Sequence, residues 1–231
     1  PVQAQFTAPA SVAPLGGPSL PDGFYLEDAV DASFFLPVTV AFLPDGRMLV
    51  VQKSGIIRIV QDGDVLPEPF LDIRDEVLDH HDRGLLGIAV DPEFETTRRV
   101  FVSYTVDHQS TADDDRQDAF ARVASFRESA TTPSVVDPSS RRVLIGETFR
   151  TGIPSCYYSH TIGSLAVGTD GTLLVGAGDG AHYGFADGGG AYPQCFGPGR
   201  LDPSEDIGAF RSQRVQSLAG KILRVDAETG R

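Results

Sequence analysis

Residues 40–51 read Val40-Ala-Phe-Leu-Pro-Asp-Gly-Arg-Met-Leu-Val-Val51, and a related segment returns as Leu165-Ala-Val-Gly-Thr-Asp-Gly-Thr-Leu-Leu-Val-Gly176. In both segments an Asp-Gly pair separates two runs of residues that favour β-strands. Asp-Gly is typical of tight hairpin turns, because glycine accepts a positive φ without steric cost. Each segment therefore predicts a hairpin, with the turns at Asp45-Gly46 and Asp170-Gly171.

A third copy of this unit has a longer turn, in Gly87-Ile-Ala-Val-Asp-Pro92 followed by Arg99-Val-Phe-Val-Ser-Tyr104. Further β-rich segments follow the copies, at residues 55–60, 120–126, 141–145 and 220–225. Recurring units of about four short strands, none able to bury its apolar faces alone, are typical of a β-propeller. We therefore predict an all-β propeller. A β-sandwich is the alternative fold, but sandwiches lack this recurring signature.

The number of units has a consequence for domain organisation. Propellers close with about four to eight blades, and three copies are too few, so we expect a second segment to complete the ring. Residues 1–21, rich in Pro, Ala, Ser and Gly, predict an extended lead-in. Residues 22–231 then form a partial propeller of about three blades, with a long insertion at residues 181–213.

Composition narrows the class of protein. The 25 glycines and 16 prolines suit a turn-rich all-β domain, and the net charge of −13 repels nucleic acid. No stretch approaches the roughly 18 apolar residues that a membrane-spanning helix needs, so no span is expected. Cys156 and Cys195 are the only cysteines. Their even number and wide spacing favour one disulfide in a secreted or periplasmic protein; two buried free thiols are the alternative.

Three ordered segments carry a resemblance to a known family. They are Asp82-Arg-Gly-Leu-Leu-Gly-Ile-Ala-Val-Asp-Pro92, residues 160–171 running on to Gly178-Asp-Gly180, and Ser217-Leu-Ala-Gly-Lys-Ile-Leu-Arg224. Together they resemble the glucose/sorbosone dehydrogenase family of soluble quinoproteins. The resemblance implies a six-bladed β-propeller of which this chain supplies roughly the first half.

The resemblance also implies an activity. His160 matches the family's general base, which takes a proton from the anomeric hydroxyl of an aldose-type sugar while hydride passes to pyrroloquinoline quinone (PQQ) beside Ca²⁺. An imidazole suits that role at neutral pH. By the resemblance, PQQ and Ca²⁺ are bound mostly by the half of the propeller that this chain does not contain. The substrate-contacting residues are expected to be Asp82, Arg83, Tyr158 and Ser159.

Two positions depart from the family pattern. Asp82 stands where sugar-oxidising members can carry a glutamine that contacts the substrate. Ser159 stands where an acidic residue can precede the histidine, so His160 could be a weaker base. The identity of the sugar is therefore left open by the sequence.

The insertion has two interpretations. Its carboxylates could supply hard oxygen ligands for Ca²⁺; the candidates are Asp187, Asp202, Glu205 and Asp206. Alternatively, the insertion is an ordered cover over the active face, joined to the His160 region by a Cys156–Cys195 disulfide. Its aromatic residues could stack on a sugar or fill the core of the loop; they are Tyr183, Phe185, Tyr192 and Phe196.

Two weaker patterns are interpreted as structural. His80 and His81 are adjacent, and neighbours on an extended chain point in opposite directions, so a solvated loop is favoured over a metal site. Residues 176–182 resemble a dinucleotide fingerprint, but no helix signal follows them.

Three functions therefore compete. The first is a PQQ- and Ca²⁺-dependent dehydrogenase acting on a small-molecule sugar. The second is a non-catalytic propeller that binds a carbohydrate or a protein. The third is a lactonase-like hydrolase with a channel metal, for which the sequence offers no converging ligands.

Overall fold

The computed structural model describes residues 21–25, 28–108 and 118–231. Residues 1–20 of the expected lead-in lie outside that part. The described residues form strands, one short α-helix, α1 (Phe94–Thr97), and short 3-10 helices. None of the helices in the described ranges is long and apolar enough to span a membrane.

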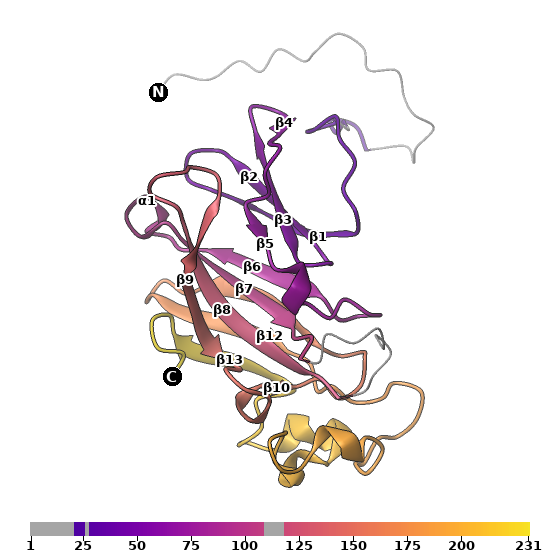
Figure 1. Cartoon of the computed structure of the whole chain (residues 1–231). Coiled ribbons are helices and arrows are strands. Elements are labelled where there is room, and N and C mark those ends of the chain that lie inside the picture. Colours follow the sequence, from indigo (N-terminus) through magenta and orange to yellow (C-terminus); the bar gives the residue numbers. More distant parts are fainter. Residues whose placement is uncertain (1–20, 26–27, 109–117) are drawn as a thin grey trace.

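The strands form three antiparallel sheets that follow one another along the chain (Figure 1). The first contains β1 (Pro37–Phe42), β2 (Met48–Gln52), β3 (Ile56–Gln61), β4 (Asp64–Val65) and β5 (Leu71–Asp72). The second contains β6 (Leu85–Val90), β7 (Arg99–Thr105), β8 (Phe120–Glu128), β9 (Val136–Ile145) and β10 (Ile153–Pro154). The third contains β11 (Ile162–Val167), β12 (Thr172–Ala177) and β13 (Lys221–Asp226).

Both predicted Asp-Gly hairpins are confirmed. β1 pairs with β2 and β11 pairs with β12, and the turn glycines Gly46 and Gly171 have φ of 89° and 77°. Each turn aspartate accepts a hydrogen bond from the backbone N–H two residues later, at 3.1 Å for Asp45 and 3.0 Å for Asp170. These bonds satisfy amide groups that the tight turn leaves without a ladder partner.

The first strands of the three sheets lie side by side. β6 packs against β1 on one side and against β11 on the other. At the second contact the approach is close: a Cβ built on Gly87 of β6 would lie 2.1 Å from the carbonyl oxygen of Gly163 in β11. Three consecutive sheets joined through their first strands are three neighbouring blades of a β-propeller, not the two facing layers of a sandwich.

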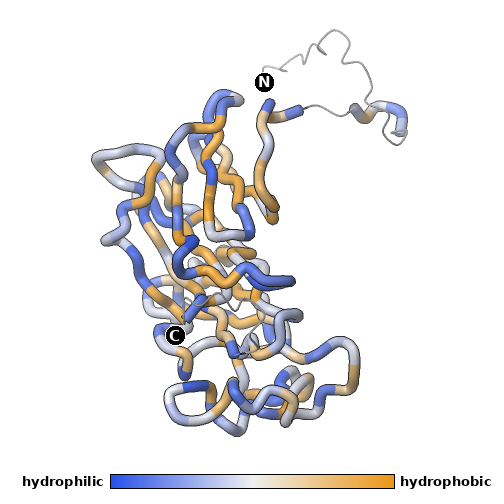
Figure 2. Tube along the Cα trace, turned by 45° about the vertical axis from the view of Figure 1, so that its right-hand side comes forward, coloured by the Kyte–Doolittle hydropathy of each residue, from blue (hydrophilic) through white to orange (hydrophobic). Residues whose placement is uncertain are grey.

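The hydrophobic core consists of two clusters, one on each side of the middle sheet. The cluster shared by the first and second sheets includes Leu49, Ile57 and Tyr104, and the other, shared by the second and third, includes Phe101 and Leu173. Every residue of β7 is buried, because that strand is covered on both faces. Figure 2 shows stretches of hydrophobic colour running through the body of the molecule, with hydrophilic colour between them.

The predicted insertion lies between β12 and β13 and contains three 3-10 helices, Pro193–Cys195, Pro203–Glu205 and Gly208–Gln213. It forms a separate loop-rich lobe in Figure 1. Cys156 and Cys195 form a disulfide with a Cα–Cα distance of 5.7 Å, so the predicted pairing is confirmed. The bond joins the insertion to the segment that precedes β11.

A candidate substrate site at the mouth of the inner strands

The residues that carry the sequence motifs meet at one edge of the second and third sheets. The loops before β6 and β11 lie together, since the backbone N–H of Asp82 donates to the carbonyl of Tyr158 at 3.1 Å. In the antiparallel pair β11–β12, Ile162 is opposite Ala177, which places the end of β12 beside the start of β11. Three segments distant in sequence therefore converge on His160.

His160 is held by a carboxylate. Its Nδ1 lies 3.0 Å from Oδ1 of Asp179, and its side chain is 44% exposed. A carboxylate can only accept, so this hydrogen bond requires the proton on Nδ1. In the neutral ring Nε2 then carries the lone pair, and it is the nitrogen available to accept a proton from a ligand.

Asp179 is a site residue to which the sequence reasoning assigned no role. It lies in the quoted Gly178-Asp-Gly180 segment, which was the one available signal. Its Oδ1 also accepts the backbone N–H of Ala181 at 3.0 Å. A Cβ on Gly178 would lie 2.1 Å from the carbonyl oxygen of His160, so only glycine allows this approach. Position 159, next to the histidine, carries a serine and not an acidic residue. The carboxylate that contacts His160 belongs instead to Asp179, just after the end of β12.

Asp82 and Ser159 form the polar edge next to His160. The hydroxyl of Ser159 donates to Oδ2 of Asp82, and the hydroxyl of Thr161 donates to the carbonyl oxygen of Asp82 at 3.0 Å. Asp82 is exposed, whereas Ser159 is buried. The exposed carboxylate is therefore fixed in place and open to a ligand hydroxyl.

The other two predicted substrate contacts have different environments. Arg83 is fully buried, and its guanidinium donates to the carbonyl oxygen of Ser155 at 2.9 Å, which fixes the loop before β11. Tyr158 is half-buried and stacks on His81 with ring centroids 4.1 Å apart. The substrate role of both residues stays a prediction, and the burial of Arg83 favours a structural one.

The four carboxylates predicted as calcium ligands each have partners within the chain. Asp187 is buried and accepts the backbone N–H groups of His182 and Gly189. The other three are used locally: Asp202 caps Ser204, Asp206 accepts from Gly190, and Glu205 pairs with Arg214. Within residues 21–25, 28–108 and 118–231 there is no group of three or more His, Cys, Asp or Glu side chains placed to hold a metal ion.

Three cationic side chains that could pair with the carboxylates of PQQ already bind other groups of the chain. Lys53 donates to the carbonyl oxygen of Asp79, Arg200 pairs with Asp118, and Arg211 is buried against the insertion backbone. These three cations and the insertion carboxylates are therefore already engaged by other groups of the described chain. Where β6 and β11 begin, the chain presents a proton acceptor, His160, and a carboxylate that can bind hydroxyl groups, Asp82.

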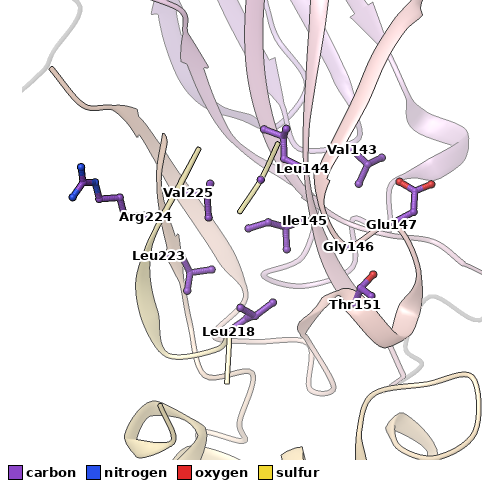
Figure 3. A pocket seen from close by; sticks show the side chains of 11 residues that line it. Val143, Leu144, Ile145, Gly146, Glu147, Thr151, Leu218, Leu223, Arg224 and Val225 are labelled. Carbon is purple, nitrogen blue, oxygen red and sulfur yellow. The ribbon is translucent and has the colours of Figure 1, made fainter. Parts of the chain in front are cut away.

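A groove elsewhere on the molecule is separate from this site. It has a volume of about 460 Å³ and lies between β9 and β13 (Figure 3). Leu144 and Ile145 line it from one side and Leu223 and Val225 from the other. No residue of the His160 region lines it, and its walls are mainly the apolar faces of neighbouring sheets.

Comparisons with known proteins agree with the geometry. A model of the family described as glucose/sorbosone dehydrogenase matches residues 34–231. Hedgehog-interacting protein of Mus musculus is 29% identical over 200 residues, which are 84% of this chain and 24% of that protein.

Solved structures share the fold. A protein described as an oxidoreductase (glucose dehydrogenase) from Thermus thermophilus is 26% identical, with a TM-score of 0.61 over 88% of this chain and 46% of that one. The PQQ-bound aldose sugar dehydrogenase of Streptomyces coelicolor is 21% identical, with a TM-score of 0.61 over 89% and 48%. The chain spans about half the length of these solved structures and about a quarter of the curated relative.

Proposed function

Because this chain belongs to the glucose/sorbosone dehydrogenase family, we propose that it supplies the base and the sugar-contacting groups of a quinoprotein dehydrogenase that oxidises the anomeric carbon of an aldose-type sugar. The observation that carries the proposal is the His160–Asp179 pair, exposed at the mouth of the inner strands. The disulfide supports a secreted or periplasmic location.

The chain's own residues have defined tasks in this reaction. Nε2 of His160 takes the proton of the anomeric hydroxyl, and Asp179 holds the ring in the tautomer that leaves Nε2 free. Asp82, positioned by Ser159, accepts a hydrogen bond from a neighbouring sugar hydroxyl. In quinoproteins of this kind, PQQ with Ca²⁺ supplies the hydride acceptor.

Dye reduction by the full-length protein tests the proposal. We expect oxidation of aldoses only when PQQ and Ca²⁺ are both added, and a fall of roughly 10²-fold or more in kcat for His160→Asn, since that is the range of general-base contributions. Asparagine suits the comparison because His160 has a φ of 54°, a backbone conformation that asparagine tolerates. A folded, PQQ-loaded protein that oxidises no aldose would contradict the proposal.

A second function is favoured by a specific observation. Hedgehog-interacting protein, which by its name interacts with another protein, matches 84% of this chain. We propose as the alternative a non-catalytic propeller that uses the same mouth to bind a carbohydrate or a protein. Equilibrium dialysis with PQQ separates the two functions: the dehydrogenase retains the quinone, whereas the binding propeller does not.

A further inference from the structure

A row of stacked rings runs from the candidate site into the insertion. The rings of His81, Tyr158, Tyr157, His182 and Phe185 follow one another with centroid separations of 4.1, 4.0, 4.2 and 4.1 Å. The angle between successive ring planes is between 21° and 34°. We call these five residues the aromatic row.

One end of the aromatic row lies at the polar groups of the site. His81 precedes Asp82 in the chain, and the carbonyl of Tyr158 accepts the backbone N–H of Asp82 at 3.1 Å. Tyr158 also lies two residues before His160. The two loops that carry His160 and Asp82 therefore also carry the first rings of the row.

The other end is open to solvent. Phe185 is 53% exposed and Tyr183, whose ring centroid is 5.8 Å from that of Tyr157, is 67% exposed. The other two aromatic residues of the insertion that were candidates for sugar stacking are less accessible. Tyr192 is buried and Phe196 is half-buried. Tyr183 and Phe185 can therefore contact a ligand, whereas Tyr192 and Phe196 pack inside the insertion.

The open end is rigidly supported. His182 Nδ1 accepts the backbone N–H of Gly184 at 2.7 Å, and Asp187 accepts the backbone N–H of His182 at 3.1 Å. A Cβ on Gly184 would lie 2.7 Å from the His182 ring, so a larger residue would disturb the loop. Fixed rings lose little conformational entropy on binding, which favours a preformed ligand surface.

The surroundings select the kind of ligand. Burial, together with the charge of Asp187, raises the pKa of Tyr192 to about 12, and burial also raises the pKa of Tyr157, so these phenols are neutral at physiological pH. Asp82, the exposed charged group of the site, is acidic and disfavours anions. Aromatic faces bind the apolar C–H face of a pyranose ring, while carboxylates accept its hydroxyl groups.

We infer that Tyr183 and Phe185 form a second sugar subsite and that the substrate is an uncharged oligosaccharide. The terminal sugar lies at His160 and Asp82, the following units extend along the aromatic row, and a later unit stacks on the exposed rings. This inference rests on the proposed function for the reaction at the terminal sugar, whereas the second subsite is defined by the rings themselves.

Binding measurements on the full-length protein test the subsite. Isothermal titration calorimetry with glucose, maltotetraose and cellotetraose gives the ratio of tetrasaccharide to glucose affinity. We expect at least one tetrasaccharide to bind more tightly than glucose, and Tyr183→Ala with Phe185→Ala to lower the ratio roughly tenfold, as expected for the loss of two ring contacts.

Phe210→Ala is the matched control. Phe210 is 63% exposed in the same insertion but is not part of the aromatic row, so the ratio should stay at its wild-type value. Far-UV circular dichroism checks that all variants fold. A ratio that is unchanged in the double variant, or tetrasaccharides that bind no better than glucose, would overturn the subsite.

Dye reduction separates failure of the subsite from failure of the proposed function. If only the subsite is wrong, glucose and tetrasaccharides are oxidised and the double substitution does not change the ratio of their KM values. If only the oxidation is wrong, no sugar reduces the dye, yet the difference in tetrasaccharide affinity persists and supports the subsite.

Discussion

His160 shows how a single residue is prepared for its task. Its φ of 54° is uncommon for a residue other than glycine, and the strain is offset by the hydrogen bond to Asp179 and by two backbone contacts. Gly180 N–H donates to the carbonyl oxygen of His160 at 2.9 Å, and Gly178 N–H donates to that of Thr161 at 2.9 Å. His160 is therefore held both by its ring, through Asp179, and by its backbone, through Gly180.

Asp179→Ala tests the positioning of the ring. Without the carboxylate we expect the neutral imidazole to move towards the tautomer with the proton on Nε2, which removes the lone pair that accepts the substrate proton. Nitrogen-15 NMR of His160 measures the tautomer directly, and kcat of the PQQ-loaded protein should fall by roughly 10²-fold.

Asp170→Ala is the control for this substitution. Asp170 lies at the opposite end of the same hairpin, where it accepts hydrogen bonds from Thr172. Its removal should leave the His160 tautomer unchanged. A wild-type tautomer in Asp179→Ala would refute the positioning role.

Among the elements, the contact between β6 and β11 sets the distance between two blades. Ser103 of β7 donates through its hydroxyl to the carbonyl oxygen of Gly163 in β11 at 2.7 Å, across the position where a side chain of Gly87 would stand. The two strands carry the loops with Asp82 and His160 at their starts. The separation of these two residues thus depends on the absence of a side chain at residue 87.

Gly87→Ala should destabilise the protein. The new Cβ would meet the Gly163 carbonyl oxygen and would lie 2.4 Å from Oγ of Ser103, so the blades must shift apart. We expect a loss of about 1–3 kcal/mol in the free energy of unfolding, the range for overpacking. Urea denaturation followed by circular dichroism measures this loss.

Gly163→Ala provides the comparison. A Cβ on Gly163 would have no atom within 4 Å, and its φ lies outside the left-handed region. Its free energy of unfolding should stay close to that of the wild type. Equal stabilities of the two variants would show that the close approach does not constrain the blades.

Across the whole molecule, several contacts tie the insertion to the propeller. They include the Cys156–Cys195 disulfide, the ion pair between Arg200 and Asp118, and the guanidinium of Arg211, which donates to the carbonyl oxygen of Asp179 at 2.9 Å. Arg211 thus binds the backbone of Asp179, whose side chain is hydrogen-bonded to His160. The fold of the insertion and the geometry of the site are therefore coupled.

Replacing both cysteines by serine should weaken this coupling. Cys156 and Cys195 are 39 residues apart, and a cross-link closing a loop of that size stabilises by about 4 kcal/mol in the chain-entropy model. We expect a loss of about 2–4 kcal/mol in the urea unfolding of the double variant. The oxidised wild type is the reference, and an unchanged urea midpoint would contradict the expectation.

The sequence by itself determined the repeating architecture. Turn chemistry and strand-forming residues are local properties, so Asp45-Gly46 and Asp170-Gly171 specified their hairpins without knowledge of the rest of the fold. The two cysteines were likewise paired correctly, because no other partner existed. The recurrence of the unit then implied stacked blades and, through the ordered motifs, the family.

Only the tertiary structure decided which side chains meet. Asp179 reaches His160, 19 positions away in the sequence, because the pairing of β11 with β12 shifts register between Ile162 and Leu165. The turn sets the regular register of the hairpin but does not specify this irregularity. The path of the insertion left no three of the predicted calcium ligands grouped to hold an ion and exposed Tyr183 and Phe185. Strands follow from short-range preferences, whereas a site formed by loops depends on how the whole chain packs, and that packing brings the distant residues together.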